Sequence, residues 1–154
     1  CQTMKSFKFS LARMRDYKEQ ILDKEKGTLR LLNRQLDEIR DRIAALVQYQ
    51  AAKHREFAAK QQEGIKAHEI KSYQVFFESA RVQLEQLHEE AHKAEEAVER
   101  QLKVVIAASQ DVSGLNKLEE KQLEEYQLAA AKADELEIAE FISSRMIRER
   151  IAAQ

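Results

Sequence analysis

The one stretch of this chain with a recognised catalytic pattern is His88-Glu89-Glu90-Ala91-His92, which matches H-E-x-x-H. On a helix the two histidines share a face at positions i and i+4, which suits zinc, and the glutamate could act as a general base. A zinc metalloprotease is therefore one alternative that the sequence raises.

The surroundings of this motif argue against that chemistry. Charged residues follow directly at Lys93, Glu95 and Glu96, so the motif is expected to face solvent instead of the dry cleft in which a zinc-bound water is activated. No third ligand is evident nearby, and His54 and His68 are predicted to be surface residues without a fixed partner. We interpret the motif as part of a solvated helix face and expect no metal.

Other catalytic arrangements are also absent from the sequence. There is no G-x-x-x-x-G-K-[ST] loop, and the three glycines are isolated, so no phosphate-cradling loop is expected. No nucleophile, base and orienting acid can be placed together from their spacing. The sequence therefore predicts a protein that is not an enzyme and uses no cofactor.

Composition favours long helices over a globular core. The chain has 154 residues, 34% of them charged, with no proline and no tryptophan, which is typical of coiled coils. The formal net charge of -1 provides no basic footprint for nucleic acid, and no apolar run approaches the ~20 residues of a membrane span. We predict one all-α domain in the cytoplasm. Met4 starts a plausible natural N-terminus, with residues 1–3 interpreted as an addition to it.

An apolar stripe with alternating steps of four and three residues organises the second half of the chain. A helix with this 3.5-residue spacing keeps one seam against a partner helix. Only Gln101 breaks the stripe. Its positions are Tyr73, Phe77, Ala80, Leu84, Leu87, Ala91, Ala94, Val98, Gln101, Val105, Ala108, Val112 and Leu115.

The partner helix is predicted in the first half of the chain. The same register runs from Leu22 to Leu46 with Glu25 as its one polar member. Ser10 is a candidate N-cap, and Gly64 stands where a left-handed C-cap belongs. We therefore predict a tail at 1–9, helix one at 10–63, a connection at 64–70 and helix two at 71–151.

A short connection makes the two helices antiparallel neighbours. Phe57 should then lie near Tyr73 and Phe77, while helix one ends opposite about Gln122. The second helix is expected to overhang beyond that point, unless the N-terminus folds back along it. Within 109–116 the residues are poor helix formers, which leaves a kink and a continuous but weakened helix as alternatives.

Two apolar groupings could contact other proteins. Near the connection, Phe76 lies off the seam, so an exposed anchor and a core residue are both open readings. In the overhang, Tyr126, Phe141 and Ile142 have no residue of helix one to cover them.

Several short segments, in this order and spacing, resemble the flagellar export protein FliJ family. They are Phe7-Lys8-Phe9-Ser10-Leu11, Tyr17-Lys18-Glu19, Ser72-Tyr73-Gln74-Val75-Phe76, Lys117-Leu118-Glu119-Glu120-Lys121, Lys132-Ala133-Asp134-Glu135-Leu136 and the basic end from Arg145 to Arg150. The resemblance covers nearly the whole chain from Met4.

The resemblance implies an antiparallel two-helix coiled coil similar to the shaft (gamma) subunit of rotary ATP synthases. It implies a non-enzymatic component of the flagellar type III export apparatus, with a stalk-like role in motility and flagellum biogenesis. The partners it implies are the hexameric export ATPase FliI, the export gate protein FlhA and export chaperones. The protein would be peripheral at the inner face of the membrane through these partners, and monomeric alone.

The resemblance also implies two sets of contact residues. The ATPase-side candidates are Phe9, Lys117, Lys121, Tyr126, Lys132, Asp134, Glu135 and Phe141. The gate-side candidates are Tyr73, Phe76, Ala80, Gln83 and Leu87. The alternatives are a stalk homologue of a virulence type III injectisome and a plain structural tether without an ATPase partner.

Overall fold

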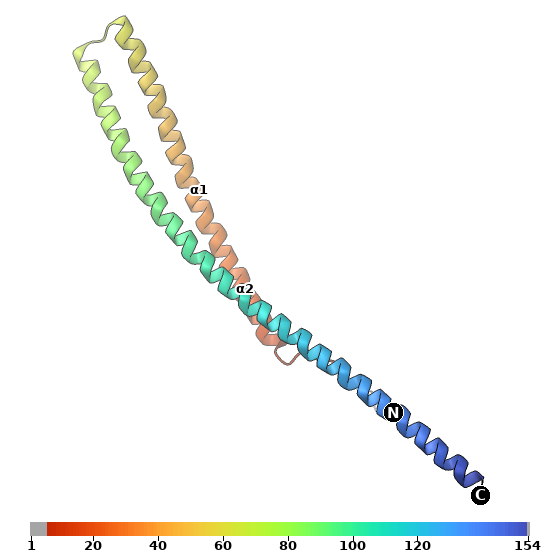
Figure 1. Cartoon of the computed structure of the whole chain (residues 1–154). Helices are drawn as coiled ribbons and strands as arrows, with labels where there is room; N and C mark the ends of the chain where they lie inside the picture. The colour runs from red at the N-terminus through yellow and green to blue at the C-terminus, as the bar shows by residue number, and fades with distance from the viewer. Residues whose placement is uncertain (1–5, 154) are drawn as a thin grey trace. The chain divides into compact units, whose positions relative to one another are not determined.

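Two long helices make up almost all of the described chain. The computed structural model describes residues 6–153, in which α1 spans Ala12–Glu63 and α2 spans Ala67–Ala152 (Figure 1). No strand occurs among these residues, so the predicted all-α fold with a longer second helix is confirmed. The reading of Met4 and of residues 1–3 falls outside the described residues.

Contacts divide the chain into two compact units. The hairpin unit is Leu22–Ala107, and the terminal unit combines Cys1–Ile21 with Ala108–Gln154. Each unit is described by itself below. The interpretation of the chain as a single domain stays a prediction.

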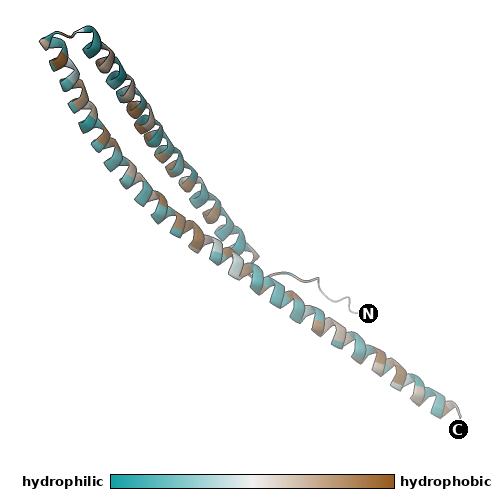
Figure 2. Cartoon of the chain, turned by 45° about the horizontal axis from the view of Figure 1, so that its top comes forward, coloured by the Kyte–Doolittle hydropathy of each residue, from teal (hydrophilic) through white to brown (hydrophobic). Residues whose placement is uncertain are grey.

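In the hairpin unit, α1 and α2 run antiparallel, side by side (Figure 1). The predicted seam faces inward: Leu36, Tyr73, Ala80 and Ala91 are buried, and the remaining seam positions of this unit are half-buried. Apolar and polar residues alternate along both helices, as brown and teal in Figure 2. The predicted neighbours are confirmed where rings meet, because the ring centre of Phe57 lies 4.9 Å from that of Tyr73 and 6.0 Å from that of Phe77.

The two polar members of the seams meet each other. The Gln101 side-chain amide donates hydrogen bonds to the Glu25 backbone carbonyl at 3.0 Å and to the Glu25 carboxylate. A half-buried polar pair of this kind favours one register of the two helices, because any slip leaves its groups without partners.

The connection between the helices is shorter than predicted. Gly64 has φ 102°, the left-handed conformation that the predicted C-cap requires. However, α2 begins at Ala67 and not at 71, because the Lys66 carbonyl already accepts hydrogen bonds from the amides of Glu69 and Ile70. Glu69 in this first turn is favourable near the positive end of the helix dipole.

The start of α1 also differs by two residues from the prediction. Ser10 and Leu11 form a turn in which the Phe9 carbonyl accepts the Ala12 amide at 3.2 Å, so α1 begins at Ala12. The turn positions Phe9 to pack inward.

In the terminal unit, the N-terminal segment folds back along α2. Phe9 is only 8% exposed, and the ring centre of Phe7 lies 5.7 Å from that of Tyr126. Arg15 forms an ion pair with Glu119, and Lys18 lies 3.6 Å from Asp111. The sequence left open whether the N-terminus folds back along the overhang. The structure shows that it does so as far as Tyr126, which Phe7 covers from ahead of α1.

The helix continues through 109–116 without a break. All eight residues are α-helical, and Ala108, Val112 and Leu115 keep the seam buried or half-buried. Gly114 lies on the exposed side, with nothing within 4 Å of where a Cβ would stand. The seam contacts on the other side of the helix hold this stretch in place.

Candidate functional site

The last part of α2 carries a surface that no other described residue covers. Every described residue of 131–153 is exposed. We name the helical residues 131–152 the tail segment. Its large apolar side chains are between 51% and 67% exposed, namely Leu136, Ile138, Phe141, Ile142, Met146, Ile147 and Ile151. A helix with this much apolar surface is typical of a protein-contact element.

The ATPase-side candidates divide into two groups. Lys117, Lys121, Lys132, Asp134, Glu135 and Phe141 are exposed. Phe9 and Tyr126 are not: Phe9 is buried under the Arg15 guanidinium, whose Cζ lies 5.4 Å from the ring centre, and Tyr126 packs on Phe7. These two aromatic rings therefore hold the N-terminal segment on α2.

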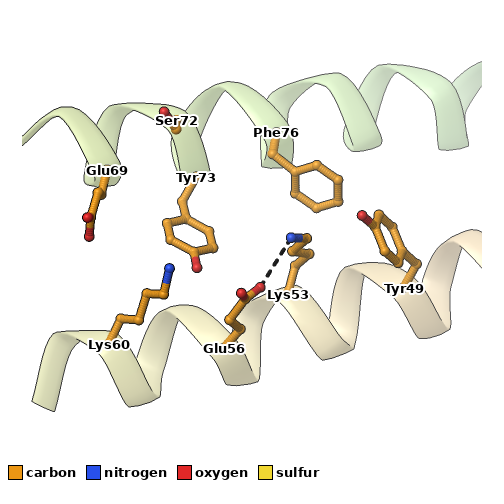
Figure 3. Close-up of a pocket in the computed structure, with 8 residues that line it drawn as sticks. All are labelled: Tyr49, Lys53, Glu56, Lys60, Glu69, Ser72, Tyr73 and Phe76. Atoms are coloured by element: carbon orange, nitrogen blue, oxygen red, sulfur yellow. Dashed lines mark ion pairs between the residues drawn. The ribbon is translucent and has the colours of Figure 1, made fainter. Parts of the chain in front are cut away.

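A groove lies between the helices near their connection (Figure 3). We name it the hairpin groove. Its volume is about 340 Å³, and it is lined by Tyr49, Lys53, Glu56, Lys60, Glu69, Ser72, Tyr73 and Phe76. The rings of Tyr73 and Phe76 extend from α2 toward the α1 side chains in the close-up.

Aromatic rings and lysines meet in this groove. Tyr49, which is 53% exposed, meets Phe76 edge to face with ring centres 5.4 Å apart. The Lys53 ammonium lies 5.8 Å from each of these two ring centres. An apolar floor with an adjacent cation suits an aromatic or acidic side chain of another protein.

Hydrogen bonds perturb the ionisable groups of the groove. The ammonium of Lys53 lies 3.2 Å from the Glu56 carboxylate, and this hydrogen bond raises the pKa of Lys53 and lowers that of Glu56. A hydrogen bond to the Tyr73 side chain raises the pKa of Lys60. Both lysines are thus charged at neutral pH, and the groove keeps two cations beside its rings.

The structure does not bring all five gate-side candidates to one surface. Tyr73 and Ala80 are buried, and Leu87 is half-buried in the seam. Phe76 is half-buried beside Tyr49 and forms a partly covered wall of the groove. Its role as a contact for another protein stays a prediction. The exposed Gln83 lies elsewhere, on the outer face of α2, in a shallow depression with Val75 and Val82.

Sequence reasoning missed three residues of the groove region. Tyr49 and Lys53 face Phe76 from α1, and His54 stacks on Phe77 with ring centres 3.9 Å apart. The expectation that His54 has no fixed partner is wrong. The predicted pairing of Phe57 with Tyr73 could have located two of them, because Lys53 and Tyr49 lie one and two turns before Phe57.

The H-E-x-x-H residues lie on an exposed face of α2. His88 and His92 are exposed, and His92 Nε2 lies 3.0 Å from the Glu96 carboxylate while Lys93 lies 3.6 Å from Glu89. Among residues 6–153, no group of three or more histidine, cysteine, aspartate or glutamate side chains could hold a metal ion. The motif forms side-chain pairs along one helix.

Neither helix, in the part of the chain described, is long and apolar enough to cross a membrane.

An antiparallel hairpin of two long helices, without strands in the described chain, places the protein in the class of all-α helical hairpins. Within that class, the model of the family described as flagellar FliJ protein matches residues 7–150. The chain therefore belongs to the FliJ family, whose members are components of the flagellar export apparatus. A search of the curated proteins and a search of the solved structures each gave no match.

Proposed function

We propose that this protein is a stalk-like, non-enzymatic component of the flagellar type III export apparatus that binds the hexameric export ATPase through its terminal unit. Through the hairpin groove it would contact the export gate, and it would also meet export chaperones. In this role it is cytoplasmic and is held at the membrane by its partners. The family match supports a role in the flagellar export apparatus, and the exposure of the apolar side chains of the tail segment is the observation that supports an ATPase contact there.

The exposed apolar surface of the tail segment suits a partner that binds a single helix. Phe141 is 67% exposed and Ile142 is 51% exposed, on adjacent positions of a stretch of α2 that no other described residue covers. Buried aromatic and aliphatic anchors carry most of the binding energy in protein interfaces. Lys132, Asp134 and Glu135 supply charges of both signs at the rim.

The test is a titration of the protein into its cognate export ATPase. We expect a higher hydrolysis rate and a larger hexamer population as the protein is added. Phe141→Ala combined with Ile142→Ala should raise the concentration needed by ~10–30-fold, the cost of losing a central anchor of ~1.4–2 kcal/mol.

The control is Leu102→Ala, which truncates a similarly exposed apolar residue of the hairpin unit. It should leave the titration unchanged. If the unsubstituted protein alters neither hydrolysis nor hexamer population, the ATPase contact is wrong.

The gate contact is tested at Tyr49. Tyr49→Ala should weaken binding of the soluble gate domain about tenfold, because it removes an exposed ring that closes the groove over Phe76. Isothermal titration calorimetry measures this directly. The matched control is Tyr17→Ala, a 62% exposed tyrosine of the terminal unit; equal losses in both variants would contradict a contact in the groove.

A further inference from the structure

The tail segment has its charges sorted into two halves. Its first half holds Asp134, Glu135, Glu137 and Glu140 together with Lys132, whereas its second half holds Arg145, Arg148 and Arg150 together with Glu149. Within the described chain, the only ion pair among them joins Arg145 to Glu149 at 3.4 Å. The four acids of the first half, Arg148 and Arg150 thus face solvent without a charged partner in the described chain.

Between these halves runs an apolar stripe. Ile138, Ile142 and Met146 recur every four residues and so share one face of the helix, with Phe141 at its side. Such a stripe is suited to pack against another helix with the same spacing.

We propose that the tail segments of two copies of this chain pair antiparallel. When Ile142 of one copy meets Ile142 of the other, Ile138 lies beside the second copy's Met146. Asp134 and Glu135 then lie beside the second copy's Arg148 and Arg150. A parallel pair would instead place acids beside acids and arginines beside arginines, which is unfavourable.

The charge balance favours a second copy over a partner of one sign. The tail segment carries four cationic and five acidic side chains, the fourth cation being Lys132. A strongly acidic or basic surface would attract one half and repel the other. In the opposite direction, the predominantly acidic half of one copy lies beside the predominantly basic half of the other at both ends of the pair.

The pair should be weak and exchangeable. One short helix-to-helix contact buries less than the ~1,200–2,000 Å² of a standard stable interface. Its ion pairs lie at the surface, so added salt screens them. The pairing goes beyond the proposed function and needs no ATPase, so the two proposals can fail separately.

The test is sedimentation equilibrium of the full chain at low salt, up to on the order of 100 μM. We expect a reversible dimer that weakens with salt. Asp134→Arg with Glu135→Arg should weaken it at least tenfold, as should Arg148→Glu with Arg150→Glu. An equimolar mixture of these two variants should dimerise again.

The matched control is Glu90→Arg with Glu99→Arg, which makes the same change of charge at exposed positions of the hairpin unit that have no charged partner in the described chain. It should leave the dimer intact, and circular dichroism should show equal helicity in all variants. A chain that stays monomeric throughout, or a dimer indifferent to both tail variants, would overturn the proposal.

Disulfide trapping reports the orientation, in a background with Cys1→Ser. Ala139→Cys mixed with Met146→Cys should form a disulfide between the two chains. Ala139→Cys alone should not, since an antiparallel pair separates its two copies by ~10 Å along the helix, beyond disulfide reach. An efficient disulfide in Ala139→Cys alone indicates a parallel pair and contradicts the proposal.

Discussion

Gly64 and Gly114 have different backbone conformations, so replacing each by alanine should change the stability of the protein in opposite directions. Gly64 has φ 102°, which other residues rarely adopt, whereas Gly114 is helical and exposed with open space around it. We expect Gly114→Ala to raise the free energy of unfolding by ~0.5–1 kcal/mol, since alanine restricts the unfolded chain and favours helix.

Gly64→Ala should have the opposite sign and lower the free energy of unfolding by ~1 kcal/mol or more, because of the left-handed backbone. Urea unfolding followed by circular dichroism measures both variants. Two changes of the same sign would be inconsistent with these conformations.

Which seam residues are covered could be predicted from spacing alone, whereas the stacking of rings beside the seam could not. All thirteen positions of the second-half stripe are buried or half-buried, because a 3.5-residue repeat determines which side of a helix meets its partner. The stacking of His54 on Phe77 depends on which flank of the seam each ring occupies. That depends on how the two helices are rotated about their axes, which the repeat does not specify closely enough.

The N-terminal segment ahead of α1 packs against α2, although it is not helical. We expect Phe9→Ala to lower the melting temperature, because truncating a buried ring costs ~3–5 kcal/mol when its site is well packed. Phe141→Ala, at 67% exposure, should change stability by no more than ~0.5 kcal/mol.

Differential scanning calorimetry compares these two variants. Equal shifts would mean that Phe9 does not hold the segment on α2. The difference between the two melting temperatures also tests whether the stability of α2 beyond Tyr126 is independent of the N-terminal segment.

At the scale of elements, the sequence predicted helix ends where a residue type determines them. Gly64 ended α1 as expected, because glycine adopts the left-handed cap at low cost. The segment from Phe7 to Leu11 has no helical repeat, so the sequence left its return along α2 as an open alternative and did not indicate which ring it would cover. Aperiodic segments are positioned by tertiary contacts, which sequence spacing does not report.

For the whole molecule, the fold alone does not specify a function. The pairing of Gln101 with Glu25 and the rings at Phe57 establish an antiparallel hairpin, but many helical proteins share that arrangement. The family match over residues 7–150 adds that the protein is a component of the flagellar export apparatus.

If both proposals hold, a second copy and the ATPase use overlapping surfaces of the tail segment. Self-pairing would then reduce, by mass action, the concentration of free protein available to the ATPase.

The tight connection at Gly64 has a consequence for how the chain acquires its structure. Closing a loop costs more conformational entropy the longer the loop is, so contacts beside the turn are the least costly to form first. Phe57 and Tyr73 are close in sequence, whereas Phe7 and Tyr126 lie near opposite ends of the chain. Folding should therefore nucleate at the turn and proceed like a zipper toward the termini, with the N-terminal aromatic rings docking last.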